Sequence, residues 1–439
     1  MATSCYCYYN YSNHYNCPCH FRTDRVGVTR VFLHQLSCIK ISGPGFGSGS
    51  GSGSGSGCEF VLPKKKSKWL GRRRFKLVAS AELSHSLSVN IGLDSKQAIM
   101  GDSKTHTWQE AFKVLGIKYN RDGTLNREIQ IPMVDATPTA DPKQPNQLAL
   151  STDIPLSPYN KAYIRLYIPS NTPTGTKLPL IIYLHGGDFV LFSASTVIFH
   201  EFCNNIAGQF PAVVASVEYR LAPENRLPAA YDDALNAILW AKDQARGVGG
   251  RDPWLEYADF SRVFIMGSSA GANIAYHVAL RALDFDLGPL KIIGLLMNQP
   301  FFGGLQRTQS ELRLEEDKYV PLYVCDVLWS LALPQGANRD HEFCNPINGG
   351  SYLGRVERLP RCFVKSDEGD PMVDRAMQLV HLLQSYGVPV IYQFNRGGYH
   401  GMELLDKAAA KNLYDDMKEF VYSTKPNQNG CGHGPNRCF

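Results

Sequence analysis

The chain has 439 residues, and none of its apolar runs approaches the ~18 residues that a membrane-spanning helix requires. It also has no closely spaced set of His and Cys ligands for a metal and no glycine-rich phosphate loop. With 44% hydrophobic residues it can still bury a substantial core. These features predict a globular protein that does not span a membrane and uses neither a metal nor a nucleotide cofactor.

Acidic residues are scarce in the first 80 positions, which hold twelve Lys or Arg but only Asp24 and Glu59. The rest of the chain holds 33 basic and 38 acidic side chains, so the overall net charge of +5 comes from the N-terminal part. The acidic body offers no extended basic surface, and we therefore predict no nucleic-acid partner.

The N-terminal part also includes an alternating Gly-Ser run at 47–57, which is typical of flexible coil, and a basic block at 64–74. We expect residues 1–99 to be a disordered basic leader. It would be either a transit peptide or an extension of the gene model upstream of Met100. Residues 425–439 are expected to form a disordered tail. The predicted location is cytoplasmic, or plastid if the leader is a transit peptide.

Cysteine is sparse in the body between these ends. Of twelve cysteines, only Cys203, Cys325, Cys344 and Cys362 lie there, and they are widely spaced. This pattern favours a body whose thiols remain reduced. The Cys-x-Cys pairs of the leader do not match the usual C-x₂₋₄-C spacing of zinc ligands.

Strand-like and helix-like segments alternate along the body. We predict strands at 128–134, 162–168, 180–184, 212–218, 263–266, 292–296, 362–365 and 389–394, helices at 108–115, 196–206, 229–246, 374–386 and 408–422, and a loop at 135–160. Antiparallel strands followed by an alternation of strand and helix predict one α/β domain over 100–424 with a largely parallel sheet.

Residues 267–271 (Gly-Ser-Ser-Ala-Gly) follow a short apolar strand and precede an Ala-rich helical run. They match G-x-S-x-G, in which a sharp strand-to-helix turn exposes the central serine, here Ser269. The N–H of Ala270 and the helix dipole would favour an oxyanion there. The alternative is a tight turn without catalytic function, but the flanking strand and helix favour Ser269 as a nucleophile.

A second glycine-containing turn, His185-Gly186-Gly187, directly follows the apolar strand at 180–184. Its consecutive N–H groups can point at one spot and, with the N–H of Ala270, complete an oxyanion hole. We interpret His185 as a support of this loop rather than as an acid or base. The alternative for the motif is an ordinary turn at a strand end.

An acid and a base are expected after later strands. Asp370 precedes Pro371, which holds it in an extended or turn conformation, while Asp367 and Asp374 are rivals, the latter as a helix cap. His400 is the base candidate of the loop after 389–394, although by itself it could be a surface histidine. The chain order Ser, Asp, His is that of the hydrolase elbow, in which His takes the serine proton and Asp orients the His.

Residues 112–423 resemble plant carboxylesterases of the hormone-sensitive-lipase-like branch of the α/β hydrolases. The resemblance is carried by the stretches at 185–187 (HGG), 216–224 (SVEYRLAPE), 228–233 (PAAYDD), 267–273 (GSSAGAN), 369–371 (GDP) and 399–401 (YHG). It implies a central, mostly parallel eight-stranded sheet flanked by helices, with a helical cap built from the start of the body and residues 301–340. Because the family's triad acid is the Asp before Pro, it supports Asp370 over its rivals.

The resemblance also implies an apolar acyl or alcohol pocket. Its lining would be Phe189, Phe302, Tyr319, Val320, Tyr323, Trp329 and Tyr399. Ordinary core packing is the alternative for each of these side chains.

One position departs from the family pattern. The family usually has a third Gly after His-Gly-Gly, and this chain has Asp188. If Gly187, Asp188 and Ala270 are the oxyanion donors, Asp188 retains its N–H but lacks the backbone freedom of glycine. Its carboxylate would also repel an oxyanion, unless it points away and caps the following segment.

The predicted function is a serine carboxylesterase that hydrolyses a small carboxylic ester of plant metabolism through an acyl-enzyme. One alternative is a lyase or cyclase that uses the triad for proton transfer. Another is a small-molecule receptor resembling the gibberellin receptors, which lack the catalytic His, whereas His400 is present here. The expected partner is a small ester, and the expected assembly is a monomer or homodimer.

Overall fold

A computed structural model describes residues 106–423, except 130, 142–145 and 157–161, and two short strands near the N-terminus. The chain divides into two units, residues 1–87 and 88–439. In the first unit, β1 (Tyr8–Asn10) and β2 (His14–Asn16) pair antiparallel. The remainder of the predicted leader and the predicted tail lie outside the described residues.

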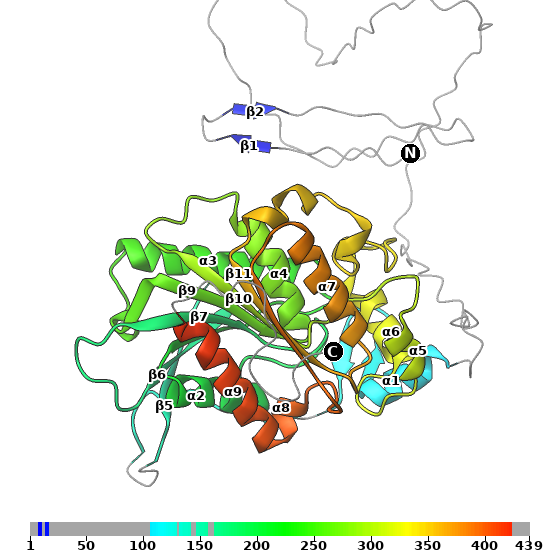
Figure 1. Cartoon of the computed structure of the whole chain (residues 1–439), viewed down its shortest axis with the longest axis horizontal. Coiled ribbons are helices and arrows are strands. Elements are labelled where there is room, and N and C mark those ends of the chain that lie inside the picture. The colour runs from blue at the N-terminus through cyan, green and yellow to red at the C-terminus, as the bar shows by residue number, and fades with distance from the viewer. Residues whose placement is uncertain are drawn as a thin grey trace, which may run out of the picture. The chain divides into compact units, whose positions relative to one another are not determined.

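The second unit is built on an eight-stranded sheet in the order β12-β11-β10-β9-β7-β8-β6-β5 (Figure 1). The strands are β5 (Ala149–Pro155), β6 (Tyr163–Pro169), β7 (Leu178–Leu184), β8 (Val213–Val217), β9 (Ala258–Ser268), β10 (Ile292–Asn298), β11 (Arg361–Asp367) and β12 (Val390–Asn395). β6 pairs antiparallel with both β5 and β8, and the other neighbouring pairs are parallel. The predicted α/β class and mostly parallel sheet are confirmed.

Helices cover both faces of this sheet (Figure 1). The helices α2 (Val197–Gln209) and α9 (Lys407–Tyr422) pack on one apolar face. On the other face lie α3 (Ala229–Arg246), α4 (Ala270–Ala282) and α7 (Val373–Ser385). Every residue of β7 and of β8 is buried, as expected of parallel strands with helices on both sides.

The remaining helices include a group that forms the cap. α1 (Trp108–Leu115) packs against α6 (Leu322–Ala332), with α5 (Gln309–Arg313) nearby (Figure 1). The cap therefore comes from the start of the body and from part of residues 301–340, as predicted. The other elements are the hairpin β3 (Ile117–Tyr119) and β4 (Leu125–Arg127), the helix α8 (Met402–Leu405) and the 3₁₀ turns η1 (Pro253–Leu255), η2 (Pro346–Asn348) and η3 (Leu353–Arg358). In the part of the chain that is described, no helix combines the length and apolarity needed to cross a membrane.

Two predictions of secondary structure were wrong. The strand predicted at 128–134 is absent, because β4 ends at Arg127 and Met133 makes only an isolated bridge to Thr196. Conversely, β5 lies inside the predicted loop 135–160. Its sequence (ALSTDIP) has no continuous apolar run, but pairing with β6 at the sheet edge supplies the backbone hydrogen bonds that stabilise it.

Candidate active site

Ser269 lies in the sharp turn between β9 and α4, at the carboxyl edge of the sheet. Its backbone takes φ 56° and ψ −122°, a strained combination for a residue with a side chain. A Cβ on Gly267 would lie 2.0 Å from the carbonyl oxygen of Gly271, and a Cβ on Gly271 would lie 1.9 Å from that of Leu184. Only glycine fits at these two positions, and the turn they permit leaves the Ser269 side chain partly exposed.

His400 bridges Ser269 and Asp370. Its Nε2 lies 2.9 Å from Ser269 Oγ, and its Nδ1 lies 3.0 Å from Asp370 Oδ2. Asp370 is fully buried and accepts further hydrogen bonds from Ser366 Oγ (3.1 Å) and the backbone N–H of Met372 (2.8 Å). The three predicted residues are thus brought together in the geometry of a nucleophile, a base and an orienting acid.

The two rival acids have other partners. Asp367 accepts hydrogen bonds from the side-chain amides of Gln299 (2.9 Å) and Asn395 (3.0 Å). Asp374 accepts from the backbone N–H of Ser310 (2.8 Å). Among the three candidates, only Asp370 is placed beside the His400 ring.

Two opposing effects act on the pKa of His400. Burial by itself would lower this pKa, but the charge of Asp370 and its hydrogen bond outweigh burial, and Asp188 adds to the increase. The net result is a pKa of about 9. His400 is therefore mainly protonated at neutral pH and must lose the Nε2 proton before it can accept one from Ser269.

The turn between β7 and α2 faces Ser269 with its backbone in the left-handed region. Gly187 has φ 106° and Asp188 has φ 55°. A Cβ on Gly187 would lie 2.3 Å from the carbonyl oxygen of Leu191, so this position requires glycine. No carbonyl of the described loops accepts a hydrogen bond from the amides of Gly187, Asp188 or Ala270. These three N–H groups, predicted as oxyanion donors, remain available at the end of the sheet where Ser269 lies.

The Asp188 side chain points toward Ser269 instead of capping the following segment. Its Oδ1 lies 3.3 Å from Ser269 Oγ, which donates to it. Burial raises the pKa of Asp188, while the charge of His400 and the hydrogen bond from Ser269 lower it in part. The Ser269 hydroxyl donates to Asp188 Oδ1 while His400 Nε2 is protonated, and it has two competing acceptors, Asp188 Oδ1 and Nε2, once His400 is neutral.

His185 packs beneath the turn that carries Gly187 and Asp188, on the side of the protein core. Its ring is buried and stacks on Tyr219 at a centroid distance of 4.2 Å, and the Tyr219 hydroxyl donates to the His185 carbonyl (2.9 Å). Burial lowers the pKa of His185 to about 4, so it is neutral near pH 7. A Cβ on Gly186 would lie 3.2 Å from the Ser268 carbonyl oxygen, which leaves little space between this turn and the Ser269 turn.

Four of the predicted pocket residues are buried. Phe189 and Trp329 lie with ring centroids 5.4 Å apart, Phe302 packs edge-on against Tyr276, and Val320 is also buried. Trp329 lies on α6 of the cap, and Tyr276 lies on α4.

The three predicted tyrosines are more exposed. Tyr319 stacks on Tyr399 at 4.4 Å, and Tyr399 directly precedes His400 in the chain. Tyr323 instead stacks on His106 at 3.9 Å. Of the predicted pocket residues, Tyr399 of the Tyr319–Tyr399 pair is thus the one nearest to His400 in sequence.

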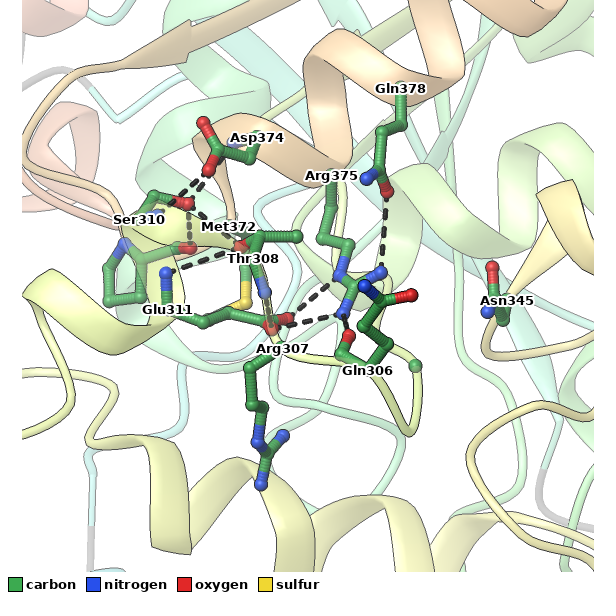
Figure 2. A network of polar contacts seen from close by, with 12 residues as sticks. Gln306, Arg307, Thr308, Ser310, Glu311, Asn345, Met372, Asp374, Arg375 and Gln378 are labelled. Carbon is green, nitrogen blue, oxygen red and sulfur yellow. Dashed lines mark hydrogen bonds and ion pairs between the residues drawn. The ribbon is translucent and has the colours of Figure 1, made fainter. Parts of the chain in front are cut away.

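Polar contacts join the cap to the chain that follows Asp370 (Figure 2). The sequence did not predict these contacts. Ser310 Oγ donates to the carbonyl of Pro371 (2.7 Å). Glu311 and Arg375, both buried, form a bidentate ion pair at 2.8 and 2.9 Å. The sequence signal for part of this network is the Thr308-x-x-Glu311 capping box, which the structure contains. No group of three or more His, Cys, Asp or Glu side chains could hold a metal ion in the described part of the chain.

Comparison with known proteins identifies the family of this chain. A family model described as the α/β hydrolase fold matches residues 181–404. Probable carboxylesterase 8 of Arabidopsis thaliana is 44% identical over 329 residues, covering 73% of this chain and 97% of that protein. A 3-O-acetylpapaveroxine carboxylesterase of Papaver somniferum is 46% identical over 309 residues, covering 68% and 93%.

Two more distant similarities concern the fold and the receptor alternative. The structure of an esterase from Pyrobaculum calidifontis superimposes with a TM-score of 0.52 at 25% identity, covering 63% of this chain and 86% of that one. The gibberellin receptor of Oryza sativa is 41% identical over 186 residues, covering 42% of this chain and 50% of the receptor. The carboxylesterases thus match nearly over their whole length, and the receptor over half of its length. The chain therefore belongs to the plant carboxylesterases of the hormone-sensitive-lipase-like branch of the α/β hydrolases, and it is a carboxylic ester hydrolase.

Proposed function

We propose that this chain is a serine carboxylesterase that hydrolyses a small carboxylic ester of plant metabolism through an acyl-enzyme on Ser269. The observation that carries the proposal is the double contact of His400, with Nε2 2.9 Å from Ser269 Oγ and Nδ1 3.0 Å from Asp370 Oδ2. A base in hydrogen-bond reach of a nucleophile, oriented by a third group, is the arrangement that activates serine.

In the proposed reaction, the neutral Nε2 of His400 takes the proton of Ser269 as Oγ attacks the ester carbonyl carbon. Asp370 stabilises the imidazolium, and the N–H groups of Gly187, Asp188 and Ala270 face the oxyanion. The bond to the alcohol oxygen then breaks, and His400 gives its proton to the departing alcohol. Water repeats the sequence on the acyl-enzyme, which releases the carboxylic acid and restores Ser269.

The relatives suggest where to begin with substrates. Two proteins from Papaver somniferum, 46% and 47% identical to this chain, are named for 3-O-acetylpapaveroxine. We propose an acetyl or other small acyl ester, with part of the substrate lying against the Tyr319–Tyr399 pair.

The test is turnover of p-nitrophenyl acetate and butyrate by the full chain, with Ser269→Ala and Ser268→Ala as a matched pair. Ser268 directly precedes Ser269, and its buried hydroxyl has no hydrogen-bond partner among the described residues. We expect Ser269→Ala to abolish turnover and Ser268→Ala to retain it. No turnover by the native protein, or full turnover by Ser269→Ala, would overturn the proposal.

A second candidate is a lyase or cyclase that uses the same residues for proton transfer. It is favoured by Asp188, a carboxylate with its Oδ1 3.3 Å from Ser269 Oγ and thus able to accept a proton there. The receptor alternative is less well supported, because the position of His400 beside Ser269 suits catalysis. Incubation with plant metabolite extracts would separate the three functions: hydrolysed esters, products formed without hydrolysis, or bound and unchanged ligand.

A further inference from the structure

One short segment after β10 contacts the backbone of Ser269 on both sides. The N–H of Ser269 donates to the carbonyl of Asn298 (2.9 Å), and the carbonyl of Ser269 accepts from the N–H of Phe301 (3.1 Å). Residues 298–301 therefore hold the strained turn that presents the Ser269 hydroxyl.

The side chain of Gln299, in the same segment, contacts the loop that carries His400. Its Nε2 donates to the carbonyl of Tyr399 (3.0 Å), and its Oε1 accepts from the N–H of Gly401 (2.6 Å). These two backbone groups belong to the residues immediately before and after His400. Gln299 thus binds the backbone on both sides of His400, as a neighbouring strand would do.

A third contact extends this attachment. The side-chain amide of Asn298 donates to Glu403 Oε1 (2.7 Å) in α8, directly after the His400 loop. Asn298, the last residue of β10, and Gln299, which follows it, therefore hold the chain from Tyr399 to Glu403. Because Asn298 and Phe301 of the same segment hold the backbone of Ser269, residues 298–301 contact both the nucleophile and the loop of the base.

The orientation of the Gln299 amide is determined by Asp367. A carboxylate only accepts, so Asp367 Oδ2, at 2.9 Å, must face the Nε2 group of Gln299. Asp367 is itself held by Asn395 (3.0 Å), and the backbone N–H of Gln299 donates to the carbonyl of Lys365 (2.7 Å). Both N–H bonds of the Gln299 amide and its oxygen are therefore satisfied, although the residue is only 2% exposed.

The backbone conformation of Gln299 is energetically unfavourable. Its φ of +45° lies in the left-handed region, which a residue with a long side chain rarely adopts. Such a conformation persists only when the surrounding contacts over-determine it, and it is commonest at functional sites.

We propose that Gln299 is a positioning residue that keeps His400 Nε2 in register with Ser269 Oγ, with Asp367 as the group that orients its amide. This inference rests on the proposed function of His400 as the base. It assigns a function to Asp367, which is a support of the base and not an alternative acid.

The test compares Gln299→Met, which keeps the length of the side chain but removes its hydrogen bonds, with the control Gln393→Met. Gln393 is also a buried glutamine, on β12, and its Oε1 has no partner among the described residues. In the full-length protein we expect Gln299→Met to lower kcat on p-nitrophenyl acetate by about 10- to 100-fold, since misplacement by about 1 Å costs up to a hundredfold. KM should change little, and Gln393→Met should retain the native kcat even if both variants lose thermal stability.

A second variant, Gln299→Glu, separates positioning from folding. Glutamate can still accept from Gly401, but it cannot donate to Tyr399, and it places a negative charge beside the His400 loop. We therefore expect a lower kcat together with an upward shift of the apparent pKa of the pH–rate profile. A loss of thermal stability alone would not move this pKa.

Titration of His400 by nuclear magnetic resonance of ¹⁵N-labelled histidine distinguishes this inference from the proposed function. If Gln299→Met displaces His400 from Asp370, the pKa of His400 should fall toward its ordinary value, and Gln393→Met should leave it unchanged. This comparison can be made even if the native protein hydrolyses no ester, in which case only the proposed function fails. An unchanged His400 titration in Gln299→Met would overturn the inference.

Discussion

The carboxylate of Asp188 should slow ester hydrolysis, and removing its charge should accelerate the reaction. Its Oδ1 lies 3.3 Å from Ser269 Oγ, on the side of the turn whose N–H groups are proposed to bind the oxyanion. Asp188→Asn is the cleanest perturbation, because Asn has the same shape and tolerates the left-handed backbone that Asp188 adopts.

The size of the effect follows from the distance between the charges. Two unit charges about 4 Å apart near a protein surface interact by about 4 kcal/mol. Asp188 is only partly buried, so solvent weakens this interaction, and the imidazolium of His400 offsets part of the repulsion. We therefore take about a quarter to a half of this interaction energy as the repulsion between Asp188 and the oxyanion. The expected gain is about 1–2 kcal/mol, which corresponds to about 5- to 30-fold in kcat.

The assay is kcat on p-nitrophenyl acetate, taken at the high-pH plateau of each pH–rate profile. This choice matters because Asp188 also contributes to the raised pKa of His400, and a comparison at one neutral pH would mix the two effects. Asp188→Gly, which restores the residue usual in the family, should accelerate the reaction at least as much. A plateau kcat in Asp188→Asn equal to or below the native value would refute the argument and favour a direct role of Asp188 in proton transfer.

Three further predictions concern pH and stability. In the native protein kcat/KM should rise with pH through an apparent pKa of about 9, because protonated His400 cannot act as a base. A kcat/KM that has already reached its plateau at neutral pH would contradict this. Glu311→Gln leaves Arg375 buried without its counter-charge and should lower the free energy of unfolding in guanidinium by about 3–5 kcal/mol, whereas an unchanged unfolding midpoint would contradict it. Gly271→Ala would place a Cβ 1.9 Å from the Leu184 carbonyl oxygen and should prevent stable folding, so a native melting temperature would show the reasoning to be wrong.

Much of the fold could be predicted because its strongest signals are local. The continuous apolar runs at 180–184 and 263–266 predicted buried parallel strands, and they lie in β7 and β9 at the centre of the sheet. β5 was missed because its sequence has no continuous apolar run and because it depends on pairing with β6.

The candidate residues could also be predicted, because each lies in a loop within a few residues of a strand end or in a turn with a specific motif. The carboxyl ends of parallel strands meet at one edge of the sheet, so Ser269, Asp370 and His400 were expected to lie close together even though 131 residues separate the first from the last. Reasoning from the residues alone still left three acids open, since proximity to a strand end does not say which carboxylate reaches a given ring.

What remained undecided depends on side chains that meet across long stretches of sequence. The direction of the Asp188 carboxylate, the ion pair of Glu311 with Arg375 and the contacts of Gln299 with the His400 loop leave no periodic or local pattern. Motifs and apolar runs specify the scaffold and the reacting groups, because those depend on neighbours in sequence. Only the packed structure decides how the groups are oriented, because each orientation results from hydrogen bonds and charges contributed by residues that lie 64 to 102 positions away in the sequence.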